Sequence, residues 1–229
     1  MTLSRREFST CLALGGLAAA GAAPQVSAQA AAVEDVNYIR LAQPAPTTPG
    51  KIEIIEFFWY ECPHCNAFEP ALEAWARQLP GDVAFRRVPV WFREEPFSAQ
   101  QRLYYAVENL GLLPTLHRRI YYAIHNDRTR LRSPEDIVAY MTRNGVDAEK
   151  FMAAYNSFTV QAKAQQARQT AAAYKIDAVP AMGVHGRFYT NGALANAGAG
   201  DSRTGGGSND RMLAVVDALV ARIRKDGKI

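Results

Sequence analysis

The hydrophobic pattern of the chain first becomes regular at residues 51–59 (KIEIIEFFW), which are β-branched or aromatic almost throughout. Such a run predicts a strand that is covered on both faces. Apolar side chains then recur at helical spacing from Phe68 to Leu79, and Pro80-Gly81 ends the pattern. A second apolar run covers residues 83–90. The order strand, helix, strand predicts a parallel pair with a right-handed crossover.

The period becomes helical from residue 97 to about residue 158. Helices are expected to begin near Ser98, Pro114, Ser133 and Asp147, because serine and aspartate cap helices and proline is favoured in the first turn. Residues 116–132 are basic, and we interpret them as a solvated helix face.

The C-terminal part returns to a mixed pattern. It predicts a long helix over residues 160–174, a strand over 176–184, and a tight turn at His185-Gly186 into a second short strand. A loop covers residues 191–209, and a last helix runs from about 210 to 224. The whole pattern indicates an α/β fold with an inserted all-helical domain, preceded by an extended lead-in over residues 31–50.

The N-terminus has the features of an export signal. Arg5 and Arg6 precede a weakly apolar run, Cys11 to Ala23, which is shorter than the ~20 residues of a membrane span. Small residues allow cleavage after Ala28 or Ala30. The paired arginines fit twin-arginine export, and general secretion remains open. The net charge of +4 comes without a dense Lys/Arg run, so we expect no nucleic-acid partner.

Two cysteines, Cys62 and Cys65, remain after the signal is removed. A disulfide between them closes a four-residue loop and restricts the unfolded chain very little, so it is a poor structural staple. Half of a zinc site is one alternative, but we expect no metal, because His117, His125 and His185 lack a ligand spacing. A buried, chemically idle pair is another. We favour dithiol–disulfide exchange.

The position of the pair supports this chemistry. At a helix N-terminus, backbone N–H groups stabilise the Cys62 thiolate, and Cys65 follows one turn later, where it can attack a mixed disulfide. His64 adds a donor or a positive charge beside the thiolate. Stabilising the thiolate favours the reduced form and makes the disulfide a better oxidant, so Pro63 and His64 bear on the redox direction.

Three segments, EFFWYECPHC, SFTVQAKAQQ and VPAMGVHGRFY, resemble the DsbA family of periplasmic thiol:disulfide oxidoreductases. The resemblance implies a thioredoxin-like fold with an inserted all-helical domain. Its implied parts are an export signal (1–28), a first thioredoxin-like part (29–96), a helical insertion (97–159) and a second thioredoxin-like part (160–229).

The resemblance also implies roles for single residues. Cys62 is the exposed sulfur that forms a mixed disulfide with a client protein, Cys65 resolves it, and His64 stabilises the Cys62 thiolate. Pro180 is the cis-proline beside the disulfide, and Val179 lies in the loop that pairs with client backbone. From the residues alone, a proline inside an apolar strand pattern indicates a strand edge, a bulge or a cis bond.

The implied function is donation of the Cys62–Cys65 disulfide to unfolded, newly exported proteins that contain cysteines. The implied partner is a quinone-linked membrane oxidase like DsbB, and we expect a periplasmic monomer. No cofactor is expected besides the redox-active disulfide. A reductase or isomerase of the same fold is the close alternative. A metal-binding or client-holding module whose thiols do not turn over is the other.

Two glutamates near the cysteines are unusual. Glu56 shares a strand face with apolar residues, so burial should raise its pKa. We interpret it as a proton donor and acceptor for Cys65, or as the partner of Arg86 or Arg87; both can hold together. Glu61 directly precedes Cys62. Its carboxylate either disfavours the thiolate or points to water, and we favour the second. The Gly-rich stretch 198–208 is interpreted as a flexible insertion.

Overall fold

The computed structural model describes residues 32–92, 98–198 and 207–227. The chain divides into two units after Ala30, and every described residue belongs to the second. The predicted export signal and almost all of the Gly-rich stretch lie outside the described residues. None of the described helices is long and apolar enough to cross a membrane.

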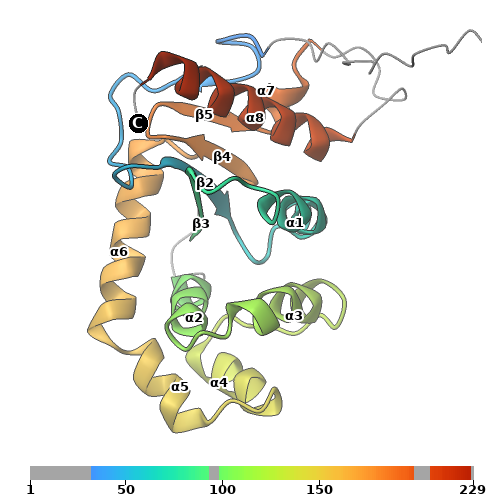
Figure 1. Cartoon of the computed structure of the whole chain (residues 1–229). Helices are drawn as coiled ribbons and strands as arrows, with labels where there is room; N and C mark the ends of the chain where they lie inside the picture. Colours follow the sequence, from blue (N-terminus) through green and yellow to red (C-terminus); the bar gives the residue numbers. More distant parts are fainter. Residues whose placement is uncertain (1–31, 93–97, 199–206, 228–229) are drawn as a thin grey trace, which may run out of the picture. The chain divides into compact units, whose positions relative to one another are not determined.

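A five-stranded mixed sheet lies at the centre of the fold, with the strand order β1-β5-β4-β2-β3 (Figure 1). Strand β2 (Ile52–Phe58) pairs in parallel with β3 (Val83–Pro89), and all seven of its residues are buried. This confirms the predicted parallel pair. On its other side β2 pairs antiparallel with β4 (Ala181–Val184), which continues antiparallel to β5 (Phe188–Asn191).

The sheet differs from the prediction at its edge and at β4. The lead-in contributes a short edge strand, β1 (Ile39–Arg40), antiparallel to β5. The strand predicted for residues 176–184 is limited to Ala181–Val184, because the chain before it bends through the cis-proline at position 180. A short helix, α7 (Gly192–Asn196), occupies the start of the predicted loop, where the Asn191 side chain accepts a hydrogen bond from the Leu194 N–H.

Helices cover both faces of the sheet. Helix α1 (Pro63–Ala76) and the C-terminal α8 (Ser208–Asp226) share one hydrophobic core with the sheet. That core includes Ile52, Ile54, Phe68, Leu72, Met182, Val184, Met212 and Val216. The opposite face packs against α6 (Phe158–Ala173) and the other helices, in a second core that includes Ile55, Phe57, Leu103, Ile120 and Val160.

The segment between β3 and α6 is helical, as predicted. It consists of α2 (Ser98–Asn109), α3 (Leu113–His125), α4 (Pro134–Arg143) and α5 (Ala148–Tyr155) (Figure 1). Two of the expected caps are present. The Ser133 hydroxyl accepts from the Asp136 N–H at 3.1 Å, and the Asp147 carboxylate accepts from the Lys150 N–H at 2.8 Å.

Tyr174, directly after α6, packs over strand β4. Its ring lies 5.1 Å from that of Phe57, and its hydroxyl accepts a hydrogen bond from the Gly186 N–H at 2.8 Å. A Cβ atom on Gly183 would overlap the Tyr174 ring. The missing side chain of Gly183 therefore makes the space in which Tyr174 lies.

Candidate active site

Cys62 is the N-cap residue of α1. Its backbone is extended (φ −80°, ψ 115°), and its sulfur accepts a hydrogen bond from the Cys65 N–H at 3.4 Å. Pro63 fills the first helical position, where a missing N–H has no cost and the fixed φ suits the helix. The CPHC sequence therefore starts the helix and brings the first sulfur to its positive end.

The surroundings of Cys62 favour its thiolate. A hydrogen bond from the Cys65 side chain, with those from the backbone N–H groups of Cys65 and His64, outweighs the effect of burial and lowers the pKa of Cys62 to about 6. The charge of His64 acts in the same direction. Burial has the opposite result at Cys65, whose pKa it raises well above the ordinary value. The two thiols thus differ strongly in acidity.

The accessibility of Cys62 differs from the expectation. Both cysteines are free thiols, and only 7 % of Cys62 is exposed, against 0 % of Cys65. The expected exposed sulfur is therefore largely covered, because the loop before β4 lies against it. Cys62 is nevertheless the more accessible of the two cysteines, as expected.

That loop contains Val179 and Pro180, which are joined by a cis peptide bond. The Val179 carbonyl oxygen lies 3.4 Å from the Cys62 sulfur, within reach of the thiol hydrogen. The structure thus has the expected cis bond and brings Val179 and Pro180 to the thiol.

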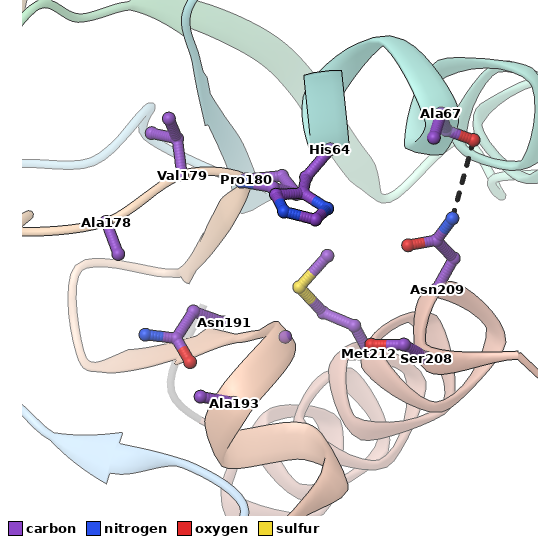
Figure 2. Close-up of a pocket in the computed structure, with 11 residues that line it drawn as sticks. His64, Ala67, Ala178, Val179, Pro180, Asn191, Ala193, Ser208, Asn209 and Met212 are labelled. Carbon is purple, nitrogen blue, oxygen red and sulfur yellow. Dashed lines mark hydrogen bonds between the residues drawn. The ribbon is translucent and has the colours of Figure 1, made fainter. Parts of the chain in front are cut away.

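A cavity of about 470 Å³ opens beside this loop. It is lined by α1, by the Val179–Pro180 loop, by residues 191–193 where β5 passes into α7, and by the start of α8, as Figure 2 shows. His64 and Pro180 both line it, Met212 points in from α8, and Asn209 donates a hydrogen bond to the Ala67 carbonyl at 3.4 Å (Figure 2). The lining is mainly apolar, so the cavity suits an apolar side chain next to the sulfur.

Glu56 is completely buried on β2. Burial has the largest effect on its pKa, followed by the nearby Glu69 carboxylate; Arg87 opposes both, and the pKa is raised to about 8. Arg87 lies opposite Glu56 in the β2–β3 register, with its Nε 3.0 Å from Glu56 Oε2. Arg86 instead pairs with Glu53. Of the two expected partners, Arg87 is the one at the site.

Glu69 is a site residue that the sequence interpretation missed. It is buried on α1, its Oε1 accepts from Arg87 Nη2 at 2.5 Å, and it lies 3.6 Å from His117 Nε2. Burial opposes ionisation of Glu69, but His117 and Arg87 outweigh it and lower its pKa. Helical periodicity could have predicted the burial of Glu69, because it lies one turn after Cys65 on the helix face that carries Leu72.

Helix α3 contacts the turn before Cys62, so the basic segment 116–132 is not a purely solvated face. His117 is buried, with its Nδ1 2.8 Å from the Tyr60 hydroxyl. His125 Nε2 lies 2.8 Å from the Tyr60 carbonyl oxygen. The interpretation as a solvated face was wrong for these residues, because a charged-looking sequence does not show which side chains the tertiary structure buries.

The expectation for Glu61 was also wrong. Its side chain is only 12 % exposed and does not point freely to water. Arg132 donates to both carboxylate oxygens, through Nε at 2.6 Å and Nη2 at 2.8 Å, and Gln100 Nε2 donates at 3.0 Å. Both partners come from the helical segment between β3 and α6, a long-range contact that local sequence does not reveal.

Within residues 32–92, 98–198 and 207–227, no group of three or more His, Cys, Asp or Glu side chains is placed to hold a metal ion. The chemistry available at the site is that of the two thiols and of the buried carboxylates behind them.

Comparison with known proteins gives the family. A family model described as DSBA-like thioredoxin domain matches residues 88–197. The thiol:disulfide interchange protein DsbA of Burkholderia cepacia is 40 % identical over 193 residues, which are 84 % of this chain and 90 % of that protein. The protein of the same name from Bordetella parapertussis is 40 % identical over 220 residues, or 95 % and 98 % of the two chains.

The chain belongs to the DsbA family. A crystal structure of Pseudomonas aeruginosa DsbA superimposes with a TM-score of 0.77 at 32 % identity, over 86 % of this chain and 97 % of that one. The thioredoxin-like fold expected from the resemblance is therefore confirmed. As a DsbA-family protein, the chain is a thiol:disulfide oxidoreductase, and the family works through a redox-active cysteine pair.

Proposed function

We propose that the chain donates the Cys62–Cys65 disulfide to exported client proteins. The observation that carries this proposal is the position of the Cys62 sulfur at the start of α1, where it accepts the Cys65 N–H. A thiolate that is stabilised there, with a pKa of about 6, favours the reduced pair. A pair that prefers to be reduced is a strong oxidant of other thiols.

Donation takes two exchange steps. A client thiolate attacks Cys62, the Cys62–Cys65 bond breaks, and a client–Cys62 bond forms. The Cys65 sulfur leaves with the electron pair and takes a proton from Glu56, whose raised pKa keeps it protonated below about pH 8. A second client thiolate then attacks the client sulfur of the mixed disulfide, and Cys62 leaves as its stabilised thiolate. The client is oxidised and the pair is reduced.

The same groups serve the reverse reaction. If the client does not form its disulfide, Glu56 in its ionised form accepts the Cys65 proton, the Cys65 thiolate attacks the Cys62 sulfur, and the client leaves as a thiolate. Pro63 starts the helix, and His64 supports the thiolate. Val179 and Pro180 would hold the client backbone beside Cys62, since the Val179 carbonyl already lies 3.4 Å from the sulfur.

The clients are unfolded or newly exported proteins with cysteines, and the apolar cavity beside Pro180 accepts a side chain near the client cysteine. A DsbB-like quinone-linked membrane oxidase would restore the disulfide. The protein would act in the periplasm as a monomer, after removal of residues 1–28 by an export signal peptidase. Residues 29–96 and 160–229 would form the thioredoxin-like parts, with residues 97–159 as the insertion.

The test is a redox equilibrium of the Cys62/Cys65 pair against glutathione, on protein without residues 1–28. We expect the pair to be reduced even when the glutathione is substantially oxidised. Cys62→Ser should abolish oxidation of a reduced model client. A pair that stays oxidised in strongly reducing glutathione would instead assign the protein to the reductases.

A further inference from the structure

The turn before the nucleophile is held by side chains of the helical segment between β3 and α6. His125 reaches the Tyr60 carbonyl, and Arg132 and Gln100 bind the Glu61 carboxylate. Arg132 lies between α3 and α4, and Gln100 is in α2. Residues from three places in this segment therefore meet at the two positions that precede Cys62.

The Arg132–Glu61 pair has the geometry of a strong contact. Both guanidinium nitrogens donate to separate carboxylate oxygens, which is the bidentate arrangement that arginine alone among the basic side chains provides. Glu61 is 12 % exposed and Arg132 is 44 % exposed, so water screens the carboxylate only in part. The charge of Glu61 is thus balanced mainly by Arg132.

The charge balance between Glu61 and Arg132 matters because Glu61 directly precedes the nucleophile, Cys62, in the chain. A negative charge near a sulfur disfavours its thiolate, and a less stable thiolate makes the disulfide a weaker oxidant. The Cys62 sulfur is also affected by His64 and Cys65 on α1, by Glu56 on β2 and by the Val179 carbonyl oxygen. The contacts described above join none of these groups to Arg132.

We propose that Arg132 is a positioning residue for disulfide donation, which binds the Glu61 carboxylate at two points and so cancels the negative charge on the residue that directly precedes Cys62. This inference rests on the proposed function and makes the helical segment part of the redox tuning. Without Arg132, the carboxylate next to the nucleophile is unbalanced and the pair becomes a weaker oxidant.

Four variants test the proposal: Arg132→Gln, Glu61→Gln, the double variant of both, and Arg130→Gln. The last removes the same charge from an exposed position in the same loop. Two quantities are measured on each: the pKa of Cys62, from thiolate absorbance against pH, and the equilibrium constant with glutathione.

Arg132→Gln should raise the pKa of Cys62 by roughly half a unit to one unit and make the pair about three- to tenfold less oxidising. The double variant should return the pKa of Cys62 to within about 0.3 unit of the parent and the equilibrium constant to within about twofold, since the charge and its partner are removed together. Glu61→Gln alone should lower the pKa of Cys62, because Arg132 then keeps a positive charge without its carboxylate.

The proposal is overturned if Arg132→Gln shifts the two values no more than Arg130→Gln does, or if the double variant keeps the full shift. If Arg132→Gln does not fold, Glu61→Gln decides: an unchanged or raised pKa of Cys62 contradicts the proposal. A failure of the proposed function would appear elsewhere, as a parent protein that is itself a poor oxidant.

Discussion

Glu56 and Arg87 face each other across the parallel strands β2 and β3, with Arg87 Nε 3.0 Å from Glu56 Oε2, and the same guanidinium also binds Glu69. One cation thus serves two buried carboxylates. Two negative charges so close cannot both be stable in a buried site. Glu69, which also has His117, has a lowered pKa, and Glu56 has a raised one. The arrangement keeps a proton on Glu56, the group that we propose as the proton donor for Cys65.

Glu56→Gln should slow formation of the mixed disulfide at pH 7 by about tenfold or more, because the leaving Cys65 sulfur loses its proton donor. The rate of mixed-disulfide formation is divided by the concentration of client thiolate at each pH. For the parent protein this corrected rate should fall above about pH 8, where Glu56 is ionised, and for the variant it should not fall. Stopped-flow fluorescence with a cysteine peptide measures both. Glu73→Gln, on helix α1 with Cys65 but outside the buried carboxylate pair, is the control. Exchange rates that match the parent across pH 5 to 8 would remove Glu56 from the proton transfer.

Arg87→Gln should destabilise the protein by about 3–5 kcal/mol, since it leaves the buried Glu69 carboxylate without its cation. Arg77→Gln is the control: Arg77 pairs with Glu73 on the surface of α1, and its loss should cost about 1 kcal/mol or less. Urea unfolding of both variants at pH 7 gives the comparison. Equal losses would mean that Arg87 is not a buried ion-pair partner.

The stability of the reduced protein should depend on pH through Cys62. The folded pKa of about 6 is below the ordinary value of 9, so the stabilisation is complete above pH 9 and is lost as the pH falls through 6. Cys65 has a raised pKa, so its titration lowers the stability of the folded protein only above about pH 9. Relative to the oxidised form, which has no thiols, the reduced form should therefore gain stability from pH 6 to pH 8. Urea unfolding of both forms at pH 5, 6, 7 and 8 tests this. A constant difference would contradict the lowered pKa.

A charge in the cavity beside Pro180 should weaken client binding without changing the redox pair. Ala193 lines the cavity and is exposed, so Ala193→Glu should raise the KM for a peptide with an apolar residue next to its cysteine by roughly 3- to 10-fold. The equilibrium constant with glutathione should not change. Ala197→Glu, exposed just after α7 and outside the cavity lining, is the matched control. Equal KM values for the two variants would show that clients do not use the cavity.

The sequence predicts those parts of the site that local patterns determine. The apolar run 51–59 predicts the buried strand, the CPHC sequence predicts the helix start, and a glutamate among apolar neighbours predicts the burial of Glu56. Glu69 lies on the buried face of its helix and could have been found by the same helical periodicity.

Other contacts depend on where the chain returns in space. Nothing near Glu61 in the sequence indicates Arg132, which is 71 residues away. His117 and His125 likewise belong to a segment that is basic by composition, and only the packing of α3 against the turn at Tyr60 shows that they contact the site. The edge strand β1 is missed for the same reason, since two residues carry too little pattern to indicate pairing with β5.

The close fit of Tyr174 over Gly183 restricts how this chain can vary. Every side chain larger than glycine at position 183 meets the tyrosine ring, and a smaller residue at 174 leaves a void beside Phe57. In a library that randomises positions 174 and 183, folded variants should therefore carry a larger residue at 183 only together with a smaller residue at 174. Any redesign of the neighbouring β4 strand has to treat the two positions as one unit.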